Sequence, residues 1–359
     1  MSVSWDQVEK EWLFGQSISL DQAEVLARFK LIEDTLGAEY LIGLRTGGLT
    51  PPILRAMLLA DKLRTISDCE GTGELLAKVK QNEPSAYSEL TAAFLLRVPG
   101  TTIEFGPEVS VKTKTKRPDF RIKSAEGEWL YVEVASPNES ELQRKAQLIV
   151  GTLAKRLAGS SAEIVLDCIL LKEPSAKEID GLCDDIGNFV RDTSPSIHNI
   201  PELCVVAINQ TAPGQAVIND YGAPSQTRIA VSTFLVDAGQ TKKTVTVRIP
   251  FEDKRAAIFI THEARQLPID SPGLVMFDMN AATTGTNIWQ QLIRRRLQPR
   301  QHTRVSAVCL FTGNFMLTEK GLGWFPHAVF IRNEYARITI PEWIQLRLES
   351  MKYPDANHG

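Results

Sequence analysis

Two carboxylates in consecutive extended segments are the residues of this chain whose type and spacing could do chemistry. Asp119 precedes the short strand-like run 120–122, and Glu133 lies inside the apolar run 130–135. If the two runs are adjacent strands, the two acids come together, and converging carboxylates bind a hard cation such as Mg²⁺. A bound divalent ion can activate water and stabilise the charge that develops on a phosphate under attack.

The apolar surroundings of Glu133 favour this hypothesis. Leu130, Tyr131, Val132 and Val134 flank the glutamate, and burying an acid there is costly without a partner or a metal. A plainer alternative also fits the pattern: Pro-Asp is a common turn dipeptide, and one glutamate in an apolar strand can be an edge residue.

The segments around the acids predict alternating helices and strands. Helices are expected at about 20–36 (N-cap Ser19), around 57–59, and at 86–97 (N-cap Ser85), 139–157, 176–191, 253–266 and 287–297. Strands are expected at 101–105, 108–114, 118–122, 129–135, 162–171, 203–209, 273–278 and 304–311. Short β segments at 228–235 and 245–249 predict an inserted β arm, and 325–331 with 335–340 predict a terminal hairpin before a short helix. Unbroken apolar strands separated by helices imply a sheet covered on both faces.

These elements predict an α/β protein in three parts. A helical N-terminal region covers 1–80, an α/β core covers 81–211, and a β arm with a C-terminal α/β extension covers 212–359. The extension is expected to pack against the core sheet or to continue it.

Composition narrows the class of protein. A hydrophobic content of 43% and a charged content of 23% are typical of a soluble globular chain, and a net charge of −3 excludes a strongly basic protein that coats nucleic acid. Such a charge still permits a local basic patch. No apolar run has the length of a membrane span, and the first residues lack the apolar core of a signal peptide. Five scattered cysteines without a CxxC pair predict free thiols and a cytoplasmic location.

The order of helix, strands, paired acids, helix and strand resembles the core of the PD-(D/E)XK, or restriction-endonuclease-like, nucleases. The resemblance covers about Ser85 to Asp167 and is carried by Glu89 in SELTAAFLL, Asp119 in RPDFRI and Glu133 in WLYVEVASP. It implies a restriction-endonuclease-like core with a mixed central sheet flanked by helices. It also implies that Asp119 and Glu133 ligate Mg²⁺ or Mn²⁺, with Glu89 as an auxiliary ligand or base.

The chain departs from this family pattern at one position. Members of the family carry a lysine two residues after the second acid, where it orients or deprotonates the attacking water, and this chain has Ala135. Some members place the lysine on a neighbouring element. Lys145 is the first candidate for that role here, ahead of Lys123 and Lys116. Loss of catalysis is the alternative, and the sequence leaves both open.

A row of basic residues precedes the acids. Lys112, Lys114 and Lys116 alternate with threonines, so in an extended strand they point the same way. With Arg117 and Arg121 they form a candidate contact surface for a nucleic-acid backbone. The alternative is an edge strand that its lysines protect against aggregation.

The expected function is therefore that of a metal-dependent nuclease that hydrolyses DNA, with Glu89, Asp119, Glu133 and Lys145 as catalytic residues. A catalytically inactive nuclease-fold module that binds nucleic acid or a partner protein is the alternative. The expected partner is DNA and not a membrane. The resemblance also implies a homodimer, because many nucleases of this fold dimerise to cut both strands.

Overall fold

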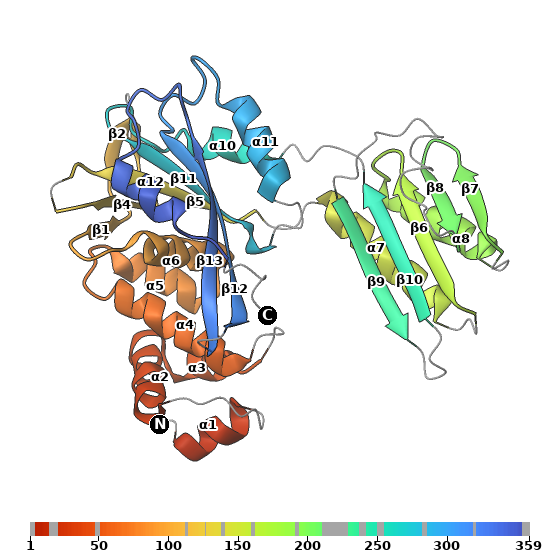
Figure 1. Ribbon diagram of the computed structural model, residues 1–359, viewed down its shortest axis with the longest axis horizontal. Coiled ribbons are helices and arrows are strands. Elements are labelled where there is room, and N and C mark those ends of the chain that lie inside the picture. The colour runs from red at the N-terminus through yellow and green to blue at the C-terminus, as the bar shows by residue number, and fades with distance from the viewer. Residues whose placement is uncertain are drawn as a thin grey trace. The chain divides into compact units, whose positions relative to one another are not determined.

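The chain folds into two compact units. The computed structural model describes residues 4–13, 21–46, 51–111, 114–125, 127–137, 141–158, 162–190, 194–209, 229–236, 242–249, 255–281, 286–318 and 321–353. Unit 1 comprises Met1–Pro137, Ala256–Asn280 and Gln290–Gly359, and unit 2 comprises Asn138–Arg255 and Ala281–Trp289 (Figure 1). The two segments of unit 2 thus lie between the three segments of unit 1 along the chain, and the longer one, Asn138–Arg255, follows Pro137. The compact units do not follow the predicted boundaries at 80/81 and 211/212.

Unit 1 begins with helices, as predicted for the N-terminal region. They are α1 (Trp5–Glu11), α2 (Gln22–Leu36), α3 (Ala38–Gly43), α4 (Pro52–Thr65), α5 (Thr72–Lys80) and α6 (Pro84–Leu96). α10 (Arg255–Glu263) and α12 (Glu342–Glu349) follow later in the chain, and α11 (Thr286–Arg296) crosses the division between the units.

The start of α6 differs from the prediction. Glu83 is its N-cap and Pro84 its first residue, so Ser85 lies inside the helix. Proline suits the first helical position because its φ is already helical and the missing N–H would have no partner there. The expected N-cap of the earlier helix, Ser19, lies outside the described residues, and α2 is capped by Asp21. α6 buries most of its side chains and packs on α4, α5 and β5 (Leu130–Ala135).

The sheet of unit 1 is mixed. Its strands run in the order β1 (Thr102–Phe105), β4 (Phe120–Lys123), β5, β11 (Gly273–Asp278), β12 (Ala307–Thr318) and β13 (Gly321–Arg332). β1, β4 and β5 are antiparallel neighbours, β5, β11 and β12 are parallel, and β13 returns antiparallel to β12. The expected mixed α/β sheet flanked by helices is therefore confirmed. Along the chain, the order is α6, β1, β4, β5, the insertion, α10 and β11.

Two strand predictions in unit 1 were wrong. The strand expected at 108–114 is a separate hairpin of β2 (Val109–Val111) and β3 (Lys114–Lys116). The terminal hairpin is formed by β12 and β13, which pair along their whole length, and not by 325–331 with 335–340. Asn333 ends β13: its buried side chain donates to Val305 O at 2.7 Å and accepts from Tyr335 N at 3.0 Å. These bonds hold a turn where the predicted second strand would begin.

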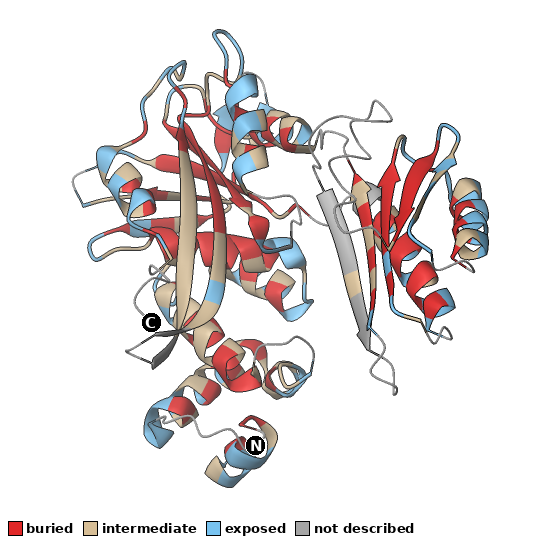
Figure 2. Ribbon diagram, turned by 45° about the vertical axis from the view of Figure 1, so that its right-hand side comes forward, coloured by how far each residue is buried: buried red, intermediate tan, exposed pale blue. Residues whose placement is uncertain are grey.

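Unit 2 has its own sheet and core. Its elements are α7 (Glu141–Leu157), β6 (Ile164–Leu170), α8 (Ala176–Phe189), β7 (Ser196–Ile200), β8 (Cys204–Ile208), β9 (Ile229–Val236) and β10 (Lys242–Ile249). The strand order is β7-β8-β6-β10-β9, with only β6 and β10 parallel. Figure 2 shows buried strands in the sheets of both units.

This second sheet corrects two expectations. β9 and β10 are not an inserted arm, because β10 pairs with β6 in the sheet of unit 2. β6 and β8, expected in the core that carries the acids, belong to this sheet as well. Apolar strands predict burial but not the sheet that buries them.

Two further sequence predictions concern the whole chain. All five cysteines are free thiols, as predicted, and four of them are buried. Over the parts of the chain that the structure describes, no helix has the length and apolar character needed to cross a membrane.

Candidate active site

The two acids that the sequence singled out come together in unit 1. The register of β4 and β5 pairs Phe120 with Val132, and its continuation by one position sets Asp119 opposite Glu133. Residues opposite one another in adjacent strands project on the same face. The carboxylate of Asp119 is fixed against β5, because Oδ2 accepts a 2.6 Å hydrogen bond from the backbone N–H of Val134.

Glu133 is the most deeply buried of these acids. It is 4% exposed, and its Oε1 has no hydrogen-bond partner. Its carboxyl group is hydrogen-bonded to that of Glu263, the last residue of α10. Glu263 also lies 3.2 Å from Nδ1 of His262. An unpaired oxygen in so buried a carboxyl group is costly, so this oxygen is a position where a cation would be stabilising.

A third acid comes from α6. Glu89 is 8% exposed and interacts electrostatically with both Asp119 and Glu133. We call Glu89, Asp119, Glu133 and Glu263 the acid cluster. It combines one residue each from α6, the start of β4, β5 and the end of α10.

The acid cluster favours protonated carboxyl groups in the absence of a cation. Burial, followed by the charges of neighbouring acids, raises the pKa of Glu133 to about 11 and that of Glu89 to about 8. Burial and the charge of Glu263 raise the pKa of Asp119 to about 7, although the Val134 hydrogen bond opposes the shift. Burial also raises the pKa of Glu263. Like charges in a poorly solvated site cannot all ionise unless a positive charge joins them.

A cavity of about 460 Å³ opens beside these acids. We call it the acidic cavity; it is lined by Gly71, Gly73, Glu74, Leu75, Lys78, Glu89, Phe105, Gly106, Arg117, Pro118 and Asp119. Glu89 and Asp119 therefore face a space that could admit a small substrate group. Glu133 is not among the residues that line it.

Glycines form the wall where α5 meets β1. Gly71 has φ +74°, and a Cβ there would lie 2.2 Å from Phe105 O. Gly106 has φ +57° and donates its N–H to Asp119 O at 2.8 Å. Only glycine combines a left-handed φ with so close an approach of two backbones. The two glycines thus fix Asp119 relative to the start of α5.

Lys78 of α5 supplies a positive charge on this cavity wall. Its Nζ lies 3.2 Å from Glu74 Oε1. Desolvation lowers the pKa of Lys78, but the Glu74 hydrogen bond and the charges of Glu89 and Asp119 outweigh it, so the net shift is upward. Lys78 is thus held in its charged form beside two acids. Ala135, which is buried on β5 where the family pattern has its lysine, cannot provide such a charge. The sequence resemblance did not point to Lys78, because it begins at about Ser85 and Lys78 lies on the helix before it.

Lys145 belongs to unit 2 and not to the unit that holds the acid cluster. It is on α7 of unit 2, where its Nζ donates to Glu173 Oε1 at 2.7 Å. The helix that follows β5 in the sequence therefore belongs to another compact unit than the acid cluster. The two other candidates for the motif lysine lie in unit 1. The Nζ of Lys123 is 4.7 Å from the ring centroid of Trp129, and Lys116 is on β3.

The predicted nucleic-acid surface is divided among different environments. Lys112 lies outside the described residues, while Lys114 on β3 is exposed. Arg117 is exposed and lines the acidic cavity, with its Nη1 3.4 Å from Glu74 Oε2. Arg121 is engaged within the fold: its Nε donates to Glu104 Oε2 at 2.7 Å, and its guanidinium stacks 4.1 Å from the Trp129 ring. Among the described members of this set, Arg117 lines the same cavity as Glu89 and Asp119.

The oxygens of Asp119 and Glu133 are the donors nearest to what a metal ion in this site would need. Among the residues described, no group of three His, Cys, Asp or Glu side chains is arranged to hold a metal. Mg²⁺ commonly takes only one or two protein carboxylates and fills its remaining positions with water and substrate phosphate. The hard oxygens of Asp119 and Glu133, including the unpaired Oε1, fit that mode of binding and not a closed protein cage.

No protein-family model matches the chain, and no curated protein sequence matches it.

Proposed function

We propose that the protein is a divalent-metal-dependent nuclease that hydrolyses DNA phosphodiester bonds in the acidic cavity of unit 1. The observation that carries this proposal is the unpaired, buried Oε1 of Glu133 within a cluster of four acids. Such a cluster gains stability from a divalent cation, and hard oxygen donors select Mg²⁺ or Mn²⁺. Unit 1 holds α6, β1, β4, β5, α10 and β11 in that chain order around one mixed sheet, and this arrangement supports the proposal.

Each residue has a role in this proposal. Asp119 and Glu133 hold the ion, and Glu89 acts as an auxiliary ligand or as the group that accepts a proton from water. The ion would supply positive charge beside the scissile phosphate and lower the pKa of the attacking water. Lys78 replaces the motif lysine, and its ammonium group stabilises negative charge that develops on the phosphate. Arg117 at the cavity wall contacts the phosphate backbone.

A second function is favoured by Ala135 and by the lack of a preformed three-ligand metal group among the described residues. In this alternative the acid cluster stays protonated, the site does not cut, and the module binds nucleic acid or a partner protein. Metal binding separates the two proposals, because the inactive module has no use for the ion.

The deciding experiment measures cleavage of plasmid and of single-stranded DNA with Mg²⁺ or Mn²⁺, together with Mn²⁺ binding by isothermal titration calorimetry. The variants are Asp119→Asn, Lys78→Met and, as a matched lysine control, Lys145→Met. The proposal expects Asp119→Asn to abolish Mn²⁺ binding and cleavage. It expects Lys78→Met to cleave more slowly and to retain Mn²⁺ binding, and Lys145→Met to behave like the wild type.

Other outcomes select other conclusions. Cleavage that depends on Lys145 and not on Lys78 would restore the prediction made from sequence. Cleavage that survives Asp119→Asn would show that the active site lies elsewhere. A protein that binds DNA in a salt-sensitive manner but neither binds Mn²⁺ nor cuts would be the inactive module.

A further inference from the structure

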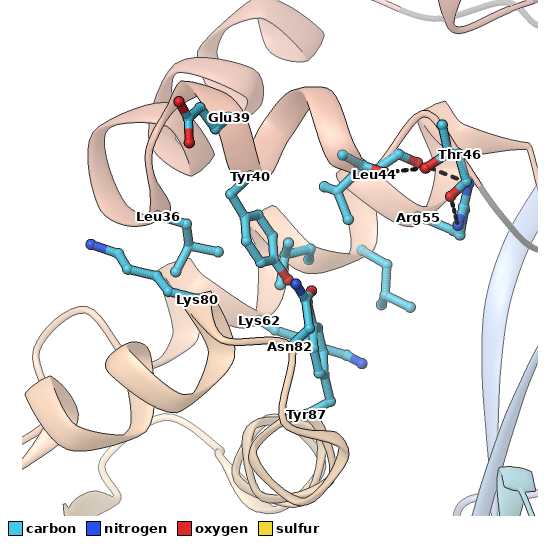
Figure 3. Close-up of a pocket in the computed structure, with 13 residues that line it drawn as sticks. Leu36, Glu39, Tyr40, Leu44, Thr46, Arg55, Lys62, Lys80, Asn82 and Tyr87 are labelled. Carbon is cyan, nitrogen blue, oxygen red and sulfur yellow. Dashed lines mark hydrogen bonds between the residues drawn. The ribbon is translucent and has the colours of Figure 1, made fainter.

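A second and larger cavity lies on the other side of the α5–α6 pair. Its volume is about 920 Å³, and Figure 3 shows the side chains that surround it. We call it the cationic cavity; it is lined by Leu36, Glu39, Tyr40, Gly43, Leu44, Thr46, Arg55, Leu58, Leu59, Lys62, Lys80, Asn82 and Tyr87. Three cations and one carboxylate thus line it, with two tyrosines and several leucines between them.

The cations of this cavity lack carboxylate hydrogen-bond partners in the described part of the chain. Arg55 donates only to backbone oxygens, Leu44 O at 2.8 Å and Thr46 O at 3.3 Å, and its buried Nε has no partner (Figure 3). Lys62 donates to Thr91 Oγ1 at 2.8 Å. Cations whose donors meet only neutral oxygens form no hydrogen-bonded ion pair, and such a site attracts anions.

The surroundings of Lys62 support this interpretation. Its Nζ also lies 5.5 Å from the ring of Trp324. Burial lowers the pKa of Lys62 to about 8, although the charge of Asp278 acts in the opposite direction. The Oδ2 atom of Asp278 accepts from Ser88 and its Oδ1 from Asn280, so that carboxylate is already hydrogen-bonded. An anion next to Lys62 would offset part of the desolvation of the ammonium group.

The neutral lining residues indicate what else the ligand carries. The buried hydroxyl of Tyr40 has no hydrogen-bond partner, and in Figure 3 its ring extends toward Asn82. Asn82 has φ +57° in the turn between α5 and α6, a left-handed conformation that asparagine adopts more readily than most residues. Leu58 and Tyr87 add apolar surface to the wall. A cavity that combines apolar walls with a few polar groups is typical of a small-molecule site, and 920 Å³ lies within the usual range.

We propose that the cationic cavity binds a phosphate-bearing ligand of mononucleotide size that lies along the tyrosines, between Lys80 on one side and Lys62 and Arg55 on the other (Figure 3). The same chemistry could be presented by a free nucleotide or by the end of a nucleic-acid strand. This site differs from the acidic cavity in its lining residues and in the sign of its charge. The inference does not rest on the proposed nuclease activity.

The test is a binding titration of the full chain with ATP, AMP, adenosine, pyrophosphate and a single-stranded 12-mer. Two variants remove cavity cations, Lys80→Met at the exposed rim and Lys62→Met inside, and Lys30→Met on α2 serves as a matched surface control. We expect ATP to bind more tightly than AMP and AMP more tightly than adenosine. We expect each cavity variant to weaken ATP binding by about 10-fold, as befits the loss of a charge-assisted contact, with no change in the control.

The rim variant keeps the test valid if Lys62→Met fails to fold, which circular dichroism would reveal. Tighter binding of the 12-mer than of ATP, with the same dependence on Lys80, would assign the phosphate to a nucleic-acid strand. Equal binding of adenosine and AMP would overturn the proposal, because the phosphate would then contribute nothing. Failure of every phosphate probe to bind, or binding that both cavity variants retain, would overturn it as well.

Discussion

The acidic cavity and the cationic cavity share the same two helices and differ in the sign of their charge. Lys78 lines the acidic cavity and Lys80 the cationic one, while Glu89 and Tyr87 divide in the same way on α6. Residues two positions apart on a helix point in directions roughly 200° apart. The α5–α6 pair thus separates a cluster that needs a cation from a cluster that needs an anion, and a shift of one residue in either helix would mix the two.

The largest effect is expected from Glu133→Gln, which replaces a carboxyl group that could ligate the ion with a neutral amide of the same shape. Cleavage should fall by at least about 100-fold, since the buried oxygen that favours the metal is replaced by an amide. ATP binding in the cationic cavity should not change. A plasmid cleavage assay measures the first effect, and an ATP titration measures the second. A parallel loss of ATP binding would mean that the two cavities are one site.

Lys78→Met and Lys80→Met form a matched pair that tests the division directly. Lys78→Met should reduce cleavage by about 10- to 100-fold, because it removes the ammonium group that compensates phosphate charge. Lys80→Met should chiefly weaken ATP binding. Steady-state cleavage and titration of both proteins check this. If both variants affect the same activity to the same extent, the helix pair does not separate two functions.

Gly71→Ala should destabilise the wall of the acidic cavity. A Cβ there would meet Phe105 O at 2.2 Å, and the residue has a left-handed φ. We expect the free energy of unfolding to fall by about 2–4 kcal/mol, as measured by urea denaturation. Gly73→Ala is the control: its Cβ would have open space, and alanine inside α5 should be neutral or stabilising. A neutral Gly71→Ala would contradict the close packing of α5 on β1.

The smallest effect expected is a pH dependence of stability in the metal-free protein. Burial raises the pKa of Glu89 to about 8 and that of Asp119 to about 7, so the folded state holds protons that the unfolded state releases. The stability that these groups contribute is complete below about pH 4 and is lost as pH rises toward 7 or 8.

This pH dependence can be isolated by comparison with Glu89→Gln, which does not titrate. The stability advantage of the variant should grow by about 1–3 kcal/mol between pH 5 and about pH 8. Saturating Mg²⁺ should reduce that difference, because the ion favours the deprotonated carboxylates. A constant difference across this range, measured by urea denaturation, would show that Glu89 is ionised throughout in the folded protein.

Local patterns in the sequence were sufficient for much of the first unit. The apolar run around Glu133 and the Pro-Asp dipeptide before the shorter run predicted adjacent strands, and β4 and β5 are adjacent. The strand 273–278 was predicted at its observed bounds. Periodicity and flanking residues determine such elements locally. The nuclease-like chemistry assigned to Asp119, Glu133 and Glu89 stays a prediction.

The partners of these elements were decided only by the tertiary structure. The longer segment of unit 2 separates β5 from α10, so α7 with Lys145, the next helix in the sequence, belongs to another compact unit than the acids, whereas α10 supplies Glu263. Glu263 reaches Glu133 from far along the chain, and Lys78 reaches Asp119 from before the motif. A sequence determines which residues are apolar or charged, and it largely determines which short segments form helices. Which buried acids share one poorly solvated space depends on long-range packing, and that packing sets their charges.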